Sequence, residues 1–324
     1  MGWNLRTRKH LAVVLVLLGP GAVSASAQED VLPEPSVQAS LAGKSLLLDA
    51  SAPGGNTVVV GDRGHVLVSS DNGDSWQQVE TPTRSTLTGV YFYDQDLGWA
   101  VGHDSVILRT VDGGVNWELV HWAPEEESPL LDVWFSDADN GFAVGAYGSF
   151  YRTADGGKSW DLDTISEWDF HLHHIARSAE GHLYLAAEAG MIYRSDDEGE
   201  TWMELSSPYE GSFFGSLPLD GETVLVFGLQ GHLFLSEDAG ESWTSIETGT
   251  TAMLTDGIRL ADGTIVISGL GGTLLFSPDG GSTFDLLPQP DRRGISAIVE
   301  AGDDQLLMVG EFGVKMMRKG DLER

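Results

Sequence analysis

The block TADGGKSW at residues 153–160 decides the fold, because it recurs as the pattern [ST]-x-D-x-G-x-x-[WF]. The other copies are SSDNGDSW at 69–76, TVDGGVNW at 110–117, SDDEGETW at 195–202, SEDAGESW at 236–243 and SPDGGSTF at 277–284. Their final aromatic residues are 41, 43, 42, 41 and 41 residues apart along the chain. A period of this size is typical of a repeat architecture, in which each unit packs only against its neighbours.

A second marker recurs with the same period. A small residue that ends a glycine-rich turn lies five positions before the first residue of each block. It occurs seven times, at Gly64, Ser105, Gly148, Gly190, Gly231, Gly272 and Gly313. The last copy is followed by VKMMRKGDLER instead of a block, so the sequence predicts seven units, the seventh without the block.

Each unit contains four short segments with the composition of strands. In the first unit, VVVG at 58–61 is followed by HVLVS at 65–69 and WQQV at 76–79, and LTGVYF at 87–92 opens the next unit. Apolar and β-branched runs of this length, separated by Gly and Asp, are typical of strands. We therefore predict an all-β chain folded as a seven-bladed β-propeller of four-stranded antiparallel blades.

The same spacing predicts the limits of the blades. Blade one runs from about residue 46 to 79, the sixth ends near 287, and the seventh supplies three strands between 295 and 318. We expect the N-terminal stretch Val31–Ala39 to supply the missing strand, so that strands from both termini close the ring and remove an exposed edge. Pro33 and Pro35 argue against this pairing, since Pro is tolerated in sheets only at edges.

Residues 1–27 have the pattern of a secretory signal peptide. A basic start at Arg6, Arg8 and Lys9 precedes the apolar run LAVVLVLL at 11–18, and AlaSerAla at 25–27 fits a cleavage site. The run is too short for a bilayer span, which needs about 20 residues. We divide the chain into a signal peptide (1–27), an N-terminal segment (28–40), a propeller (41–319) and a tail (320–324). An uncleaved anchor is the alternative for the first part.

The composition excludes several classes of function. Lys and Arg number 18 against 49 Asp and Glu, a net charge of −31, which becomes −34 when the three basic signal residues are removed. A protein this acidic repels nucleic acids and anionic membrane surfaces. It has no Cys, which excludes disulfides, thiolate metal sites and a Cys nucleophile. We expect an exported, periplasmic protein, or one in a compartment like the thylakoid lumen if the host is photosynthetic.

The repeated block itself has the residues of a turn. Its Asp accepts backbone N–H bonds, its Gly adopts a positive φ, and its aromatic residue packs between sheets. We assign this structural role to Asp71, Asp112, Asp155, Asp197, Asp238 and Asp279 and to Trp76, Trp117, Trp160, Trp202, Trp243 and Phe284. The alternative is that the six carboxylates bind a ligand, but repetition in six units favours architecture.

The block is the Asp-box, also called the bacterial neuraminidase repeat. The units YGSFYRTADGGKSW at 147–160 and SVILRTVDGGVNW at 105–117 resemble the repeat of the photosystem II assembly/stability-factor family. The resemblance covers about residues 40–318. Bacteria without photosystems also carry members of this family, so we expect this protein to be a bacterial relative. The resemblance implies an exported seven-bladed propeller that acts as an assembly chaperone rather than as an enzyme.

In that family, arginines just before the Ser or Thr of the block form a basic patch that docks the partner. The position is occupied here by Arg109, Arg152 and Arg194, and in the other units by Val68, Leu235, Phe276 and Met317. By the resemblance, we expect the three arginines on adjacent blades to bind an acidic segment of a partner protein. The alternative is that each pairs with a nearby Asp or Glu, and both interpretations stay open.

Sialidases also carry Asp-boxes, so the alternative function is a carbohydrate-active or sugar-binding propeller. The Arg-Ile-Pro element usual in sialidases is absent, and the seven units of this chain do not match the six of a sialidase.

In the segment WDFHLHH at 168–174, strand alternation places His171 and His173 on one face and His174 on the other. His171 and His173 are metal candidates if Asp169 assists, against a hydrogen-bonded channel lining. We predict no catalytic residue, no metal and no cofactor.

The sequence therefore favours an exported, non-catalytic propeller that docks a protein and serves as an assembly or stability factor for a membrane or envelope complex. The arginine sector and the mouth of the central channel are the predicted partner surfaces. We expect a monomer that does not insert into the membrane after signal cleavage, and a protein partner rather than a nucleic acid.

Overall fold

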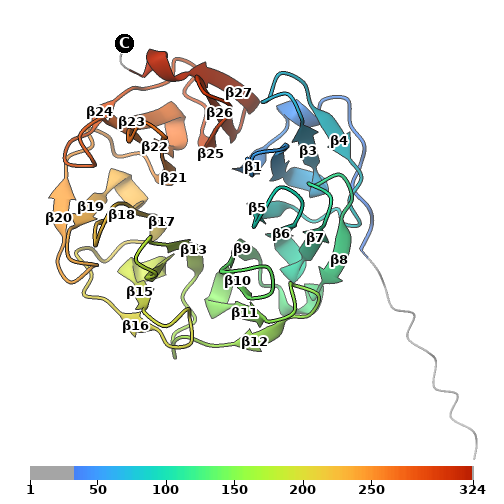
Figure 1. Cartoon of the computed structure of the whole chain (residues 1–324), viewed down its shortest axis with the longest axis horizontal. Coiled ribbons are helices and arrows are strands. Elements are labelled where there is room, and N and C mark those ends of the chain that lie inside the picture. The colour runs from blue at the N-terminus through green and yellow to red at the C-terminus, as the bar shows by residue number, and fades with distance from the viewer. Residues whose placement is uncertain (1–32, 323–324) are drawn as a thin grey trace, which may run out of the picture. The chain divides into compact units, whose positions relative to one another are not determined.

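The computed structural model describes residues 33–322, which form a ring of seven antiparallel sheets around a central axis (Figure 1). Within this range, six sheets have four strands and the seventh has three. The prediction of an all-β, seven-bladed propeller is confirmed. The predicted signal peptide and residues 28–32 lie outside the described residues. No helix in residues 33–322 is long and apolar enough to span a membrane.

The strands of each blade follow one another from the axis to the rim (Figure 1). The inner strands are β1 (Leu47–Ser51), β5 (Leu87–Phe92), β9 (Leu130–Phe135), β13 (Leu172–Arg177), β17 (Phe213–Pro218), β21 (Leu254–Arg259) and β25 (Ile295–Glu300). The second strands are β2 (Thr57–Gly61), β6 (Gly98–Gly102), β10 (Gly141–Gly145), β14 (Leu183–Ala187), β18 (Val224–Gly228), β22 (Ile265–Gly269) and β26 (Gln305–Gly310).

The outer half of each blade is less regular. The third strands are β3 (Val66–Ser69), β7 (Ile107–Thr110), β11 (Phe150–Thr153), β15 (Ile192–Ser195), β19 (Leu233–Ser236), β23 (Thr273–Ser277) and β27 (Gly313–Arg318). The outer strands are β4 (Gln77–Val79), β8 (Glu118–His121), β12 (Asp161–Asp163), β16 (Met203–Glu204), β20 (Thr244–Ile246) and β24 (Asp285–Leu286). Six one-turn helices join second to third strands: η2 (Asp62–Gly64), η3 (His103–Ser105), η5 (Ala146–Gly148), η6 (Glu188–Gly190), η7 (Leu229–Gly231) and η8 (Leu270–Gly272).

The hydrophobic cores lie between the blades rather than within them. The second strands β2, β6, β10, β14, β18 and β22 are buried along their whole length, because a neighbouring blade covers each face. Seven apolar clusters result, and each draws on two adjacent blades. Between blades one and two, for example, Val58 and Val60 pack with Phe92 and Trp117. The ring is thus a closed circle of interblade contacts.

The Asp-box closes the turn between the third and the outer strand. In blade three, Asp155 accepts hydrogen bonds from Thr153 Oγ1 (3.0 Å), Ser159 N (3.0 Å) and Ser159 Oγ (2.7 Å). Gly157 N donates to Thr153 Oγ1 (3.0 Å), and Trp160 Nε1 donates to Gly157 O (3.2 Å). The other five box carboxylates make equivalent contacts. The bonds from Ser159, followed by the bond from Thr153, lower the pKa of Asp155 to about 2.

The turn between the second and third strands requires a small residue for two reasons. Its last position has a positive φ in all seven blades, for example +75° at Gly231. A Cβ atom on Gly231 would also lie 2.3 Å from Thr250 O, in the connection to the next blade. Blade two has Ser105 here instead, with a φ of +50°, and its hydroxyl donates to Ser128 O (2.7 Å) in the corresponding connection.

The predicted fourth strand of blade seven is wrong. The described part of Val31–Ala39, residues 33–39, lies along blade one instead of beside β27. Ser36 N donates to Thr81 O (3.0 Å), and Thr81 N donates to Ser36 Oγ (2.9 Å). Gln78 Nε2 donates to Val37 O (3.0 Å), and Gln78 Oε1 accepts from Ala39 N (2.8 Å). Side chains hold this segment because Pro33 and Pro35 have no N–H to donate to a strand ladder.

Side-chain packing, rather than a shared sheet, closes the ring between its N- and C-terminal strands. Leu47 and Leu67 of blade one pack with Leu307 and Val309 of blade seven in one buried cluster. The helix η1 (Ala42–Lys44) lies against the start of β27, where a Cβ atom on Gly313 would lie 2.1 Å from Gly43 O. After β27, the helix η9 (Lys319–Asp321) leads to Leu322, which is buried against blades six and seven, so part of the predicted tail is attached to the propeller.

We expect Gly231→Ala to destabilise the protein much more than Gly263→Ala. Both glycines have a positive φ, +75° and +93°, which costs an Ala residue roughly 1 kcal/mol. Only Gly231 has a carbonyl where the new Cβ would lie, whereas nothing lies within 4 Å of it at Gly263. The clash should add roughly 2 kcal/mol to the loss. Denaturant unfolding of the two variants measures the difference, and equal losses would refute the close-approach argument.

Candidate functional site

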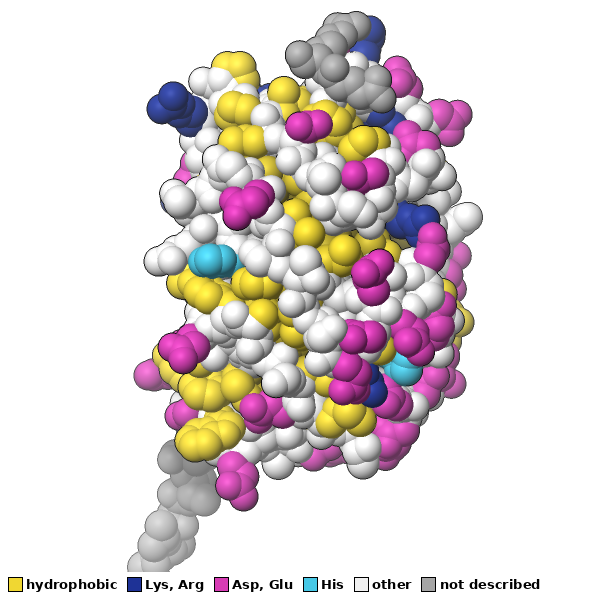
Figure 2. Space-filling model, turned by 90° about the vertical axis from the view of Figure 1, so that its left-hand side faces the viewer, with side chains coloured by type: hydrophobic (Ala, Val, Ile, Leu, Met, Phe, Trp, Pro, Cys, Tyr) yellow, Lys and Arg dark blue, Asp and Glu magenta, His cyan; other side chains and the backbone are white. Residues whose placement is uncertain are grey.

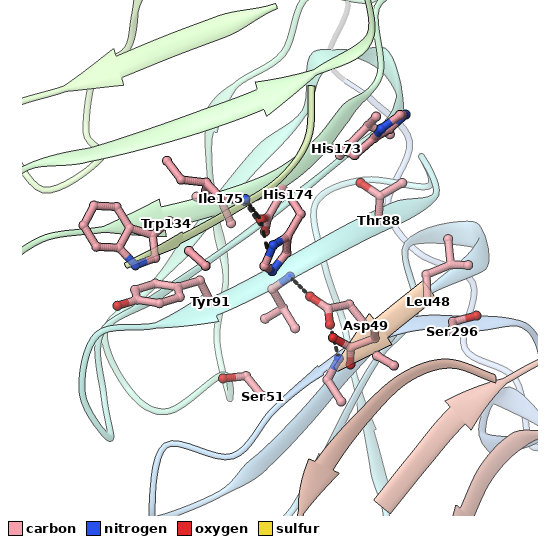
Figure 3. A pocket seen from close by; sticks show the side chains of 18 of the residues that line it. Leu48, Asp49, Ser51, Thr88, Tyr91, Trp134, His173, His174, Ile175 and Ser296 are labelled. Carbon is pink, nitrogen blue, oxygen red and sulfur yellow. Dashed lines mark hydrogen bonds and ion pairs between the residues drawn. The ribbon is translucent and has the colours of Figure 1, made fainter. Parts of the chain in front are cut away.

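A β-bulge in each inner strand turns extra side chains toward the axis. Leu47 of β1 pairs with Gly61 and Asp49 pairs with Val60, so Leu48 between them has no partner. The same shift occurs in the other six inner strands. Side chains from the second and third positions of these strands line an axial cavity of about 420 Å³ (Figure 3).

Three carboxylates at the third position join neighbouring blades. Each accepts the N–H of the residue that follows it, and its second oxygen accepts an N–H from the next blade. The bonds between blades are Val90 N to Asp49 Oδ2 (2.7 Å), Ile175 N to Asp132 Oδ2 (2.9 Å) and Ile298 N to Asp256 Oδ2 (2.8 Å). The channel acids therefore satisfy backbone groups that bulged strands leave unpaired.

The same three carboxyls share one small, buried space. Burial raises the pKa of Asp49 well above its ordinary value, and the nearby charges of Asp256 and Asp132 add to this. Burial also raises the pKa values of Asp132 and Asp256, while His174 acts in the opposite direction on both. The Nε2 atom of His174 lies 4.0 Å from Asp132 Oδ2. Ionisation of the acids is thus opposed by desolvation and mutual repulsion.

Side chains at the second position make a further set of bonds between blades. Each donates to the carbonyl of the first residue in the next inner strand. The bonds are Thr88 Oγ1 to Leu130 O (2.6 Å), His173 Nδ1 to Phe213 O (2.7 Å) and Thr255 Oγ1 to Ile295 O (2.8 Å). Together with the three carboxylates, they connect blades one to five and blades six to seven around the axis.

The histidines of blade four follow the predicted alternation only in part. His171 and His173 lie together as predicted, with ring centroids 6.2 Å apart, and both line the apolar mouth of the channel, but His174 is not on a separate face from His173. His173 and His174 both line the axial cavity, because the bulge at His173 interrupts the alternation of the strand (Figure 3). His171 precedes β13, and its Nε2 lies 3.9 Å from Glu188 Oε2. Burial lowers the pKa of His173 to about 4. Among residues 33–322, no group of three or more His, Asp or Glu side chains is arranged to hold a metal ion.

One mouth of the channel is apolar. It opens on the face that carries the turns between second and third strands, and it encloses about 550 Å³. Its apolar lining consists of Leu46, Leu48, Leu131, Phe214, Met253 and Leu270. Leu46 and Leu270 are each 40% exposed, so this predicted partner surface presents apolar side chains at the rim and carboxylates below.

Each of the three predicted arginines reaches into the Asp-box of the next blade. The contacts are Arg109 Nε to Gly156 O (2.7 Å), Arg152 Nη2 to Gly199 O (2.6 Å) and Arg194 Nη1 to Ala239 O (2.7 Å). An Arg at this position is therefore a clamp between blades two and three, three and four, and four and five. Repeat spacing alone did not reveal this role, because the acceptor lies about 47 residues further along the chain.

The three arginines differ in their ion pairs. Arg194 is largely buried and binds Asp196 through Nε (3.0 Å) and Nη2 (3.1 Å). Arg152 pairs with Glu200 (2.8 Å) and has its Nε 3.4 Å from Asp163, while its side chain is 27% exposed. Within residues 33–322, Arg109 makes no ion pair. The pairing that we considered from the sequence therefore occurs at Arg152 and Arg194, and partner binding by the three stays a prediction.

A groove of about 620 Å³ lies between blades three and four beside these clamps. Arg152 lies over the Phe142 ring, 5.3 Å from its centroid, and Arg177 at the end of β13 faces the same groove. Arg177 is 39% exposed and pairs with Glu198 (2.9 Å). Figure 2, which shows the ring from its edge, has many acidic and few basic side chains, so two guanidinium groups in one groove are a local exception.

Arg177 could not be predicted from the repeats, because it belongs to no repeated block. It occupies the last position of an inner strand, and among the inner strands only β21 ends in an Arg as well, at Arg259. A search for charges at equivalent strand ends would have found both residues. Only the fold shows that Arg177 of blade four and Arg152 of blade three line one groove.

A ring of seven blades, six of which have an Asp-box turn, defines the class of this protein as an Asp-box β-propeller. A family model described as photosynthesis system II assembly factor YCF48 matches residues 68–129 and 121–316. The match covers well over half of the chain, and the protein belongs to this family. The resemblance inferred from the repeats is thereby confirmed.

Individual relatives match over short segments. The photosystem II assembly protein Ycf48 of Thermosynechococcus vestitus is 37% identical over 43 residues, 13% of this chain. The chloroplastic photosystem II stability/assembly factor HCF136 of Cyanidioschyzon merolae is 41% identical over 54 residues, 16% of this chain. Each alignment spans only 12% of the relative's own length.

A solved structure of YCF48 bound to D1 peptide has the same fold. It superposes with a TM-score of 0.68 at 19% sequence identity, and the match covers 89% of this chain and 99% of that one. At this level of identity, the similarity shows only that the two proteins share the propeller fold. The ligand of this protein has to be inferred from its own surface.

The variant Asp49→Asn is expected to gain stability relative to the wild type as the pH rises. A carboxyl with a raised folded-state pKa holds its proton more tightly when folded, so the wild type loses stability as the pH rises above about 3.8 toward that folded-state pKa. The variant lacks this loss. Melting temperatures of both proteins between about pH 4 and about pH 8 measure the change in their difference.

The control for this experiment is Asp71→Asn in the Asp-box of the same blade. Hydrogen bonds from Ser75 lower the pKa of Asp71, so its stabilising effect is present above about 3.8 and is lost as the pH falls below that value. The difference between this variant and the wild type should therefore shrink in acid. A difference for Asp49→Asn that does not change with pH would contradict the electrostatic account of the channel.

We expect Arg194→Met to cost roughly 2–3 kcal/mol of unfolding free energy, because it leaves the buried carbonyl of Ala239 without its donor and leaves Asp196 with His182 as its remaining side-chain partner. Arg177→Met, which removes an exposed ion pair, should cost less than about 1 kcal/mol. Met keeps much of the aliphatic volume of Arg, so lost packing contributes little to the comparison. Denaturant unfolding of the two variants tests the clamp, and similar losses would argue against it.

Proposed function

We propose that this protein is an exported, non-catalytic docking protein that helps to assemble or stabilise a membrane or envelope complex. The observation that carries the proposal is the groove between blades three and four, where Arg152 and Arg177 lie together in a protein of net charge −31. Asp137, Glu198 and Glu200 line the groove as well, and the last two already pair with these arginines. Guanidinium groups recognise carboxylates by paired hydrogen bonds, so an acidic segment would bind by replacing these exposed carboxylates as partners of the arginines. The expected ligand is therefore an acidic stretch of a partner protein.

Membership of the YCF48 family supports this proposal. The matched relatives are named as assembly or stability factors, and one solved relative is named with a bound D1 peptide. We extend to this chain only the general role, binding of a protein segment. Export rests on the signal pattern of residues 1–27, and we propose the periplasm, or a lumen-like compartment in a photosynthetic host.

The arginines would contribute to docking in different ways. Arg152 and Arg177 are exposed enough to exchange their carboxylate partners for those of a ligand. Arg109 and Arg194 remain in the proposed binding sector, but their contacts with the next blade make them first of all clamps. A change at Arg194 would therefore alter stability and binding together, whereas Arg177 reports on binding alone.

No catalytic step is part of the proposal. The channel carboxylates and His173 are hydrogen-bonded to the backbone of neighbouring blades, which gives them an architectural role. The Asp at the third position of each Asp-box, such as Asp155, also has an architectural role, because it holds its own turn. We propose that the protein acts as a monomer, without a metal or cofactor.

The test uses Arg177→Glu with Arg259→Glu as its matched control. Both arginines end an inner strand and pair with an exposed acid, Glu198 and Asp220 respectively, but only Arg177 lines the groove. The tagged protein would be crosslinked and purified from its native envelope. We expect the wild type and Arg259→Glu to retain a protein of a membrane complex, and Arg177→Glu to lose at least about tenfold of it.

Two other outcomes would change the conclusion. Equal recovery with Arg177→Glu would keep the docking role and reject the groove. Recovery of no protein partner, together with binding on a glycan array or turnover of chromogenic glycosides, would reject the role in favour of a carbohydrate-active or sugar-binding propeller.

A further inference from the structure

The seventh blade ends in a strand whose outer edge is open. In the other six blades the third strand pairs with an outer strand of two to four residues. In blade seven, no strand of residues 33–322 pairs with the outer edge of β27. The N-terminal segment that begins at Pro33 lies along blade one and so does not cover this edge.

Exposure of β27 reflects the missing neighbour. The third strands β3, β7, β11 and β19 are buried at three of their four residues, and β15 is buried at all four. In β27, Val314, Met316 and Met317 are only half-buried, and Arg318 is exposed. Apolar side chains that other blades cover with an outer strand are here left partly in water.

The register of blade one shows what an added strand would meet. Val66, Leu67 and Val68 of β3 pair with Val79, Gln78 and Gln77 of β4. Counted from the turn glycines Gly64 and Gly313, the corresponding residues of β27 are Lys315, Met316 and Met317. A three-residue ladder is therefore available, and two of its residues carry flexible Met side chains that can adapt to different neighbours.

Basic residues gather around this edge. The molecule has few of them, yet six lie on blade seven or its seam with blade one: Lys44, Arg292, Arg293, Lys315, Arg318 and Lys319. Lys315 pairs with Asp291 (3.2 Å) and Lys319 with Glu300 (2.5 Å). Within residues 33–322, the other four make no ion pair. Acids lie on the same blade as well, among them Asp303, Asp304 and Glu311. An extended segment lying along the edge would meet Lys44 at the start of β27 and Arg318 at its end.

We propose that the open edge of β27 is a second docking site, which takes an extended acidic segment of a protein partner as the fourth strand of blade seven. Strand addition supplies backbone hydrogen bonds at the edge, and alternate side chains of the ligand supply specificity. Carboxylates on the segment pair with Lys44 and Arg318, and its apolar side chains lie beside Val314 and Met316, on the face toward blade one. This site is independent of the proposed groove, which lies on the far side of the ring between blades three and four (Figure 1).

The proposed site also explains why basic residues lie on and around β27. Lys on an exposed edge discourages pairing between copies of one protein, because the like charges repel. An acidic partner segment reverses this effect. The basic residues therefore disfavour pairing with β27 of a second copy and favour pairing with an acidic strand.

The test measures binding of two peptides to the purified protein. The first, acetyl-Glu-Val-Asp-Val-Glu-amide, is extended and acidic, and the second replaces each acid with Lys. We expect the acidic peptide alone to bind, with an affinity that falls as salt is raised, and to slow hydrogen exchange at the amides of Val314 to Arg318. Arg318→Glu and Lys44→Glu should each weaken binding by about fivefold or more. Lys158→Glu, an exposed lysine of blade three, is the control and should leave binding unchanged.

Three results would overturn the proposal. Binding of neither peptide, or of both equally, would remove the acidic strand as the ligand. Exchange at β27 that is slow without peptide and becomes fast when residues 28–32 are deleted would show that the chain covers its own edge. Slow exchange that depends on protein concentration would assign the edge to a second copy. The groove variant Arg177→Glu should bind the acidic peptide normally at β27, so failure here is separable from failure of the proposed groove.

Discussion

Burial of apolar side chains between neighbouring sheets is the interaction on which the whole structure depends. No blade contains a core of its own, and each sheet contributes one face to the cluster before it and one to the cluster after it. Polar contacts then fix how far each blade is rotated against the next. The channel carboxylates act at the axis, and the arginine clamps act nearer the rim. An acidic protein thus uses several of its ionisable groups as connections between blades.

The number of blades and their limits could be predicted from the sequence because the Asp-box is a local device. All of its bonds lie within eight residues, so its spacing along the chain directly counts the turns. The family could be predicted for the same reason. Features that join different blades were harder to predict. The arginine of each clamp could be identified from the repeats, but its acceptor in the Asp-box of the next blade could not.

Two errors have the same physical origin. The separation predicted between His173 and His174 assumed a regular strand, and a bulge leaves no mark in a single sequence. The ring-closing strand was predicted from the general need to cover an edge. The chain instead holds this segment on blade one, where the Ser36 hydroxyl accepts from Thr81 N and the side chain of Gln78 donates to Val37 O. General rules of sheet formation predict regular, paired strands, whereas bulges and specific hydrogen bonds determine where the chain departs from them.

The seam between blades one and seven also governs the order in which the molecule can be completed. Leu47, Val59 and Leu67 belong to the first blade that is synthesised, yet their packing partners Leu307 and Val309 lie near the C-terminus. Contacts so distant in sequence form late, because a long loop must close before they gain any stability. One apolar face of blade one therefore stays exposed to water until nearly the entire chain has been made. During that interval the exposed apolar face makes the incomplete chain prone to aggregation.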